Sequence, residues 1–111
     1  MEHVLFIQKV KKDKKEDYIK YHKNCFPGVL KVLKDSGTER EIIWIEGETL
    51  IIYAMAEDFK KSMEGLKNKK EFNKWIELMT PLLAEIQDYS KDGEIKRLEK
   101  VFDLEEQLEN R

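Results

Sequence analysis

The sequence has few of the residues that hold metals or cross-link a chain. Its 111 residues include one cysteine, two histidines and two prolines. One cysteine cannot form a disulfide within the chain, so nothing here indicates an oxidising compartment. A zinc site normally takes about three or four nitrogen or sulfur ligands, and His3, His22 and Cys25 are a poor set for one. We therefore expect no metal site.

Long apolar runs and an excess of one charge are missing too. Lysine and arginine total 21 against 23 aspartates and glutamates, a balance that does not favour nucleic acid. The lysine-rich runs at 11–15 and 67–70 are interpreted as solvated helix ends and faces. No run approaches the ~18 apolar residues of a spanning helix, and the apolar start is too short for a signal peptide. We expect a cytoplasmic protein with no membrane or nucleic-acid partner.

Common chemical motifs are absent as well. The chain contains no glycine-rich dinucleotide fingerprint, no P-loop, no HExxH, no CxxC and no calcium-binding loop. Its length suits one domain, and 41% of its residues are apolar while 40% are charged. These values are typical of a single globular domain with a very polar exterior.

A clear order of strands and helices is nevertheless present. Residues 3–10 alternate with apolar side chains on both faces, which is typical of a strand covered on both sides. Helices are expected over 13–22 and 27–35, because Pro27 disfavours a helical residue before it and suits the first position of a new helix. Two apolar runs within 41–57 flank the sequence EGET and predict a β-hairpin.

The rest of the chain contains one more predicted helical region and a tail that fits either a strand or a helix. Apolar residues at helical spacing predict a helix over 58–80, limited by Pro81. Residues 88–93 are expected to form a loop. In the tail, one set fits the face of a strand: Leu98, Phe102 and Leu104. Another set fits the face of a helix: Val101, Leu104 and Leu108.

With a strand in the tail, the order becomes βαββαβ. This order is that of the ferredoxin-like α+β fold, in which helices cover one face of an antiparallel sheet. The other face would be apolar as well, since the strand around residue 53 carries Ile51, Tyr53 and Met55 on its second side. An open apolar face of that size should find a partner. We therefore expect a symmetric homodimer joined sheet to sheet.

The stretch DYIKYHKNCFP (17–27) holds the main candidate for chemistry. Tyr18 and His22 lie one helical turn apart on an apolar face. A histidine titrates near neutral pH and so suits proton transfer, but a partly buried structural histidine fits the same pattern. Trp75 likewise fits either core packing or stacking on the apolar face of a sugar. Cys25 is interpreted as a small buried apolar group.

The order and spacing of several segments resemble the L-rhamnose mutarotases. The resemblance runs over nearly the whole chain, from FIQKV to VFDL. The matching segments are DYIKYHKNCFP with its Tyr18 and His22, VLKDSG (32–37), IIYAMAE (51–57), FNKWIELM with its Trp75, and EKVFDL. Each segment alone is common, but their order together is specific.

The resemblance implies a small cytoplasmic enzyme with a dimeric α/β-barrel built from ferredoxin-like units. It implies that His22 is the proton donor and that Tyr18 and Trp75 bind the sugar, with no cofactor. It also makes VFDL the last strand, so that residues 1–104 form the mutarotase-type domain and 105–111 a short extension. The implied activity is exchange of the α and β anomers of L-rhamnose or a similar 6-deoxyhexose.

This chain departs from the family pattern at three places. Ile76 stands where the family has a second aromatic after the tryptophan, and Glu41 stands where it has a tyrosine. The family's W-P-E-L-like helix start reads Phe26 to Val29 here. Two alternatives stay open beside the mutarotase: a small monooxygenase of the same barrel architecture, and a small-molecule-binding dimer that has lost the chemistry.

Overall fold

The computed structural model describes residues 1–85 and 97–110. In chain order the elements are β1 (Glu2–Val10), η1 (Lys12–Lys14), α1 (Lys15–Lys23), α2 (Pro27–Asp35), β2 (Thr38–Glu46), β3 (Thr49–Ala56), α3 (Phe59–Leu66), α4 (Lys70–Met79), η2 (Thr80–Leu82), β4 (Leu83–Glu85) and α5 (Leu104–Glu109). None of the helices in the described part of the chain is long and apolar enough to cross a membrane.

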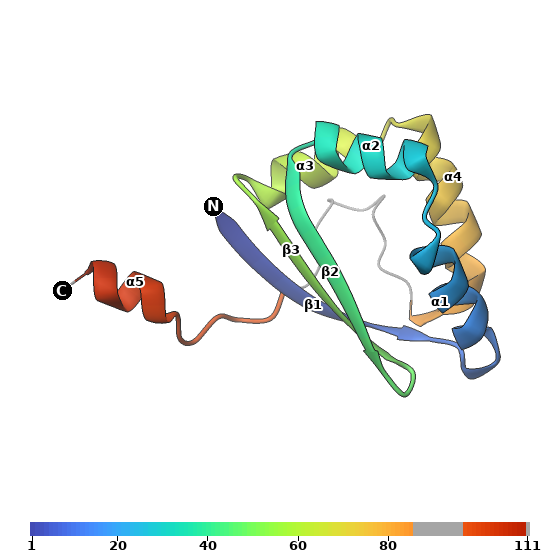
Figure 1. Ribbon diagram of the computed structural model, residues 1–111, viewed down its shortest axis with the longest axis horizontal. Coiled ribbons are helices and arrows are strands. Elements are labelled where there is room, and N and C mark those ends of the chain that lie inside the picture. Colours follow the sequence, from blue (N-terminus) through green and yellow to red (C-terminus); the bar gives the residue numbers. More distant parts are fainter. Residues whose placement is uncertain (86–96, 111) are drawn as a thin grey trace.

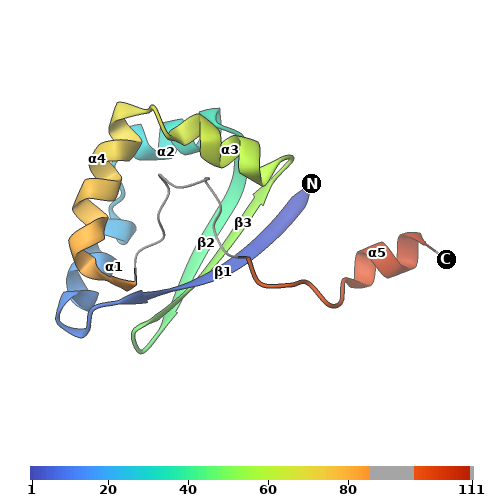
Figure 2. The same cartoon turned by 180° about the vertical axis from the view of Figure 1, so that it is seen from behind.

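The strands form one curled antiparallel sheet in the order β2-β3-β1-β4, and helices α1 to α4 cover one of its faces (Figure 1; from behind, Figure 2). This order and layering confirm the ferredoxin-like α+β fold. Successive side chains of β1 point to opposite faces of the sheet. Val4, Phe6 and Val10 are buried under the helices, while Leu5 and Ile7 point to the uncovered face.

Local signals explain most element boundaries. Pro27 starts α2 at a first helical position, as predicted. The chain then turns at Gly37, where φ is +109° and a Cβ would lie 2.8 Å from the hydroxyl of Ser62. The predicted hairpin is confirmed, with its turn at Gly47. The single helical region expected over 58–80 is two helices, α3 and α4.

The prediction that VFDL forms the last strand was wrong. The fourth strand is β4, which pairs with β1 on the side away from β3. Residues 101–103 have no regular structure and Val101 is 86% exposed. The reason is local: Asp103 is a helix cap whose carboxylate accepts the N–H of Glu106 at 3.1 Å, so the chain starts α5 here. The loop predicted over 88–93 lies outside the described residues.

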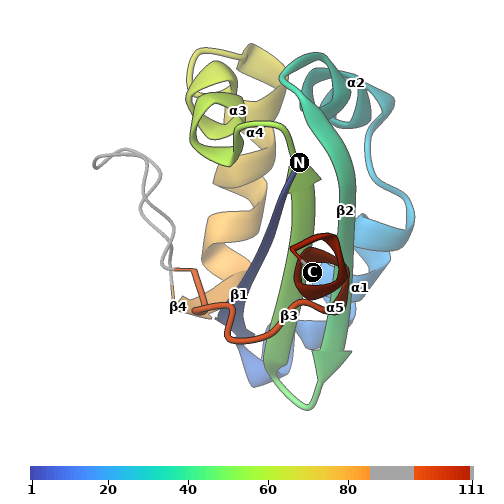
Figure 3. The same cartoon turned by 90° about the vertical axis from the view of Figure 1, so that its left-hand side faces the viewer.

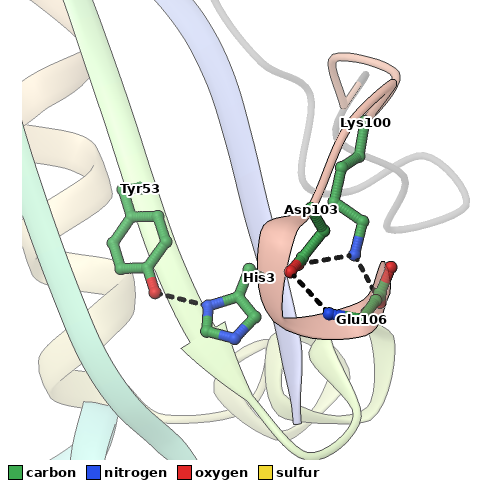
Figure 4. Close-up of polar contacts among 5 residues, drawn as sticks. All are labelled: His3, Tyr53, Lys100, Asp103 and Glu106. Carbon is green, nitrogen blue, oxygen red and sulfur yellow. Dashed lines mark hydrogen bonds and ion pairs between the residues drawn. The ribbon is translucent and has the colours of Figure 1, made fainter. Parts of the chain in front are cut away.

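The tail leaves the body on the side of the sheet opposite the helices (Figure 3). The backbone N–H of Leu98 donates to the carbonyl of Leu5 at 2.8 Å, and the chain then runs outward. Figure 4 shows the start of α5, where the Lys100 ammonium lies 2.7 Å from the Glu106 carboxylate. It also shows His3 and Tyr53 on the uncovered sheet face, joined by a hydrogen bond of 2.6 Å.

Candidate functional site

A cavity lies between the covered face of the sheet and the helices. Its larger part has a volume of about 370 Å³, and a deeper part has a volume of about 90 Å³. Both parts share a set of side chains from α1, α2, α4 and β2: Tyr18, His22, Leu33, Glu41, Ile43 and Trp75. Apolar walls with a few convergent polar groups are typical of small-molecule sites.

His22 occupies the last turn of α1, where its ring is fixed by the backbone. Its Nδ1 lies 2.9 Å from the carbonyl oxygen of Tyr18. A carbonyl only accepts hydrogen bonds, so Nδ1 carries a proton and donates it. In the neutral ring, Nε2 is then the basic nitrogen, and no hydrogen bond joins it to any described residue. This nitrogen is available to take a proton from a bound molecule.

Two aromatic rings contact the imidazole. The Tyr18 ring stacks on it, with centroids 3.9 Å apart and planes 25° from parallel. Trp75 meets it edge-on, with centroids 5.1 Å apart. Tyr18 is 5% exposed and Trp75 is 7% exposed. The structure therefore brings together the three candidate site residues from the sequence, Tyr18, His22 and Trp75.

The surroundings of His22 favour its neutral form. Burial lowers the pKa of the imidazole from its ordinary value, and this effect outweighs the hydrogen bond to the Tyr18 carbonyl, which acts in the opposite direction. The ring is therefore largely neutral near pH 7, in spite of its position at a helix C-terminus. A neutral histidine acts first as a base and then, once protonated, as the proton donor that the resemblance implies.

Glu41 enters the same cavity from β2. The register of β2 against β3 shifts between Thr38 and Arg40, which is the mark of a β-bulge. Strict alternation would put Thr38 and Glu41 on opposite faces. The bulge lets Thr38 stay buried while Glu41 lines the cavity.

The side chain of Glu41 is exposed in part, while its carboxyl lies among protein atoms in the concave wall of the cavity. Burial raises the pKa of Glu41 to about 7.

Gln8 lines the cavity, but the sequence patterns did not predict it as a site residue. It lies on the covered face of β1, is 5% exposed and lines the deeper part of the cavity. Its Nε2 has no hydrogen-bond partner among the described residues, and a buried donor without a partner is costly. The available signal was one polar residue on a strand face otherwise made of Val4, Phe6 and Val10.

Cys25 and Ile76 lie at the margins of the cavity. Cys25 is partly buried, and burial raises the pKa of its thiol, so the reactive thiolate is disfavoured. Ile76 lines the deeper part. Within residues 1–85 and 97–110, no group of three histidine, cysteine, aspartate or glutamate side chains could hold a metal ion.

Comparison with known proteins identifies the family of this chain. The family model for L-rhamnose mutarotase matches residues 3–104. The chain belongs to the L-rhamnose mutarotase family. Members of this family are carbohydrate isomerases that interconvert sugar anomers. An L-rhamnose mutarotase from Formosa agariphila is 29% identical over 110 residues, which cover 95% of this chain and 100% of the relative.

Solved structures show the same fold in this mutarotase family and beyond it. The crystal structure of an L-rhamnose mutarotase from Formosa agariphila superposes with a TM-score of 0.71 at 24% identity, over 94% of this chain and 99% of that one. A candidate antibiotic biosynthesis monooxygenase from Nitrosomonas europaea gives a TM-score of 0.58 at 16% identity, over 76% and 80%. These likenesses are to the fold alone.

Proposed function

We propose that this protein exchanges the α and β anomers of L-rhamnose or a similar 6-deoxyhexose, with His22 as a catalytic residue. The observation that carries the proposal is the placement of His22. Its imidazole lines a cavity in a chain of the mutarotase family, is in contact with Tyr18 and Trp75, and keeps Nε2 unbonded among the described residues.

The chemistry requires little more than this. The ring opens when the anomeric hydroxyl loses its proton and the ring oxygen gains one. The aldehyde turns about its bond to C2, and the ring oxygen closes on its other face. Each group that gives a proton in opening takes one back in closing, so no cofactor is consumed. One well-placed acid–base group supplies about 10²–10⁴ in rate.

The lining of the cavity suits a deoxy sugar. Leu33 and Ile43 offer apolar contact for a methyl group, while Tyr18 and Trp75 offer ring surface for the apolar side of a pyranose. We propose that these two aromatic residues bind the sugar. At the deeper end, Gln8 supplies a donor for a sugar hydroxyl, since no other described residue accepts from it.

Anomer exchange can be measured directly. Saturation-difference NMR on L-rhamnose, L-fucose and other common aldoses should show faster exchange with the purified protein than with buffer, and one sugar should respond most. No acceleration for any aldose would end the proposal. Tight binding without exchange would favour the alternative of a binding dimer that has lost the chemistry.

Gln8→Leu should raise stability and weaken sugar binding at the same time. The change removes a buried donor without a partner, so the free energy of unfolding should rise by about 1–3 kcal/mol. The lost hydrogen bond should raise KM several-fold, since such a bond contributes about 0.5–1.5 kcal/mol. Urea unfolding and exchange rates at several sugar concentrations would measure both effects.

The control for this substitution is Gln107→Leu, because Gln107 is exposed in α5. It should change neither quantity. An unchanged KM in Gln8→Leu would show that this amide does not contact the sugar, whatever its effect on stability.

We also propose that the protein is a cytoplasmic homodimer. The uncovered sheet face supports the dimer: it is apolar across three strands, and it includes Ile7, Trp44 and Ile51. Trp44 is 52% exposed there. A monomer rarely leaves such a face in water. The free Cys25, with no second cysteine to pair with, agrees with a reducing cytoplasm.

Trp44→Lys should dissociate the dimer. A tryptophan buried in an interface can contribute about 2 kcal/mol or more, so the dissociation constant should rise by about 30-fold or more. Sedimentation velocity across a dilution series would measure it. The control Glu64→Lys reverses a charge at an exposed position of α3, on the helix side, and should leave assembly intact. A wild-type protein that is monomeric at all concentrations would refute the dimer.

A further inference from the structure

The proposed reaction needs an acid as well as a base, and the cavity contains a second group of the right kind. We propose that Glu41 is a catalytic residue that works together with His22. In ring opening, Glu41 protonates the ring oxygen while His22 accepts the proton of the anomeric hydroxyl. This inference rests on the proposed function and names the partner that it requires.

Glu41 and His22 reach the cavity from two different layers of the fold. Glu41 comes from β2 in the sheet, whereas His22 comes from α1 in the helical layer. Both line the larger and the deeper part. A flat sugar ring between a strand and a helix would therefore meet one group on each side. The bulge between Thr38 and Arg40 fixes the side to which Glu41 points.

Glu41 also has no structural partner. No hydrogen bond or ion pair joins its carboxyl to another of the described residues. Most of the cavity wall is apolar, including Leu33, Ile43 and Trp75, although His22, Lys23 and Cys25 line it as well. An unpaired carboxyl in a mainly apolar wall costs free energy unless it serves a ligand.

The other titratable groups around the cavity do not replace it. From α1 these are Tyr18, His22 and Lys23, and from the link before α2 it is Cys25. No titratable side chain of α2 or α4 lines either part. The pKa of Glu41 rises through burial alone, without an offsetting effect from a cation. The raised pKa of Cys25 reflects burial first, and the nearby Glu41 adds to it.

The proton balance closes over one turnover. As the bond from C1 to the ring oxygen breaks, Glu41 gives its proton to that oxygen, and Nε2 of His22 removes the proton from the anomeric hydroxyl. An open-chain aldehyde, a carboxylate and an imidazolium result. After rotation about the C1–C2 bond, the ring hydroxyl attacks C1 and returns its proton to Glu41. His22 then protonates the new anomeric oxygen.

The shifted pKa values favour a neutral His22 and a protonated Glu41 at neutral pH, as the reaction requires. The pKa of His22 is lowered by burial, so the imidazole is neutral, while the pKa of Glu41 is raised to about 7, so much of the carboxyl is protonated. Activity should therefore fall as pH drops through the pKa of His22, where the base is lost. It should also fall as pH rises through about 7, where the acid is lost.

Glu41→Gln provides the test. The amide keeps the shape but cannot exchange a proton in this way, so kcat should fall by about 10²-fold or more. The decline above about pH 7 should disappear from what activity remains. The control Glu46→Gln alters an exposed carboxylate at the other end of β2 and should leave rate and pH profile unchanged. Glu41→Gln with the wild-type kcat and the wild-type profile would overturn the inference.

A second readout does not depend on activity. A carboxyl whose pKa is raised by folding stabilises the native state only while it is protonated, so this contribution is lost as pH rises towards and through about 7. Glu41→Gln should thus be more stable than wild type at pH 8 and equal to it near pH 4. Equal stability at both values would show that Glu41 is not buried as described.

The two proposals fail differently. If wild type accelerates no aldose, the proposed function fails, and the stability measurement still reports on Glu41. If wild type is active and Glu41→Gln is equally active, only the pairing of Glu41 with His22 fails.

Discussion

Replacing His22 with alanine should lower the rate of anomer exchange by about 10²–10⁴-fold. The loss follows from the geometry: Nε2 is the nitrogen that the hydrogen bond from Nδ1 to Tyr18 leaves available in the cavity. Because the sugar rests mainly on Tyr18 and Trp75 in this proposal, KM should change much less than kcat. Saturation-difference NMR over a series of sugar concentrations would separate the two constants.

The matched control is His3→Ala, which removes the other histidine. His3 is exposed on the uncovered face of the sheet, where it bonds to Tyr53 (Figure 4). Its removal should leave the exchange rate within a few-fold of wild type. Circular dichroism should show both variants folded, since His22 is only partly buried. A His22→Ala protein with a nearly normal kcat would exclude this residue as the catalytic base.

The helical spacing of Tyr18 and His22 was readable from the sequence because it depends on local geometry. Residues four apart on a helix face the same way whatever the rest of the chain does, and the structure shows the two rings stacked. The hairpin and the break at Pro27 were readable for the same reason. Whether His22 was structural or functional was not readable, because that depends on which segments lie opposite it.

The features that escaped prediction depend on long-range pairing. The edge strand β4 is only three residues long and follows directly on a helical turn, so no periodicity marks it. VFDL had enough apolar residues for a strand, but Asp103 caps a helix in its place. Gln8 looked like an ordinary polar residue on a strand, and Glu41 was marked only by its place at a family tyrosine position. Only the packing of α1 and α4 over the sheet shows that they line one cavity with His22.

Trp75→Ala should reduce both stability and catalysis. The indole is 7% exposed and belongs to the buried cluster with Tyr18 and Met79. Removal of a buried tryptophan costs about 3–5 kcal/mol through lost burial and an unfilled cavity. It also removes the edge-on support of the His22 ring, so kcat should fall together with sugar binding. Urea unfolding and exchange kinetics below the unfolding transition would measure these effects.

Two further variants separate packing from sugar contact. Trp75→Phe keeps an aromatic ring in the core and should retain most of the stability, while the smaller ring should raise KM. Phe26→Ala removes the second ring that meets Trp75 edge-on, at 5.6 Å, from a half-exposed position, so it should cost much less stability than Trp75→Ala. If Trp75→Phe has the KM of wild type, the tryptophan packs the core without contacting the sugar. In that case sugar binding would rest on Tyr18 and the groups deeper in the cavity.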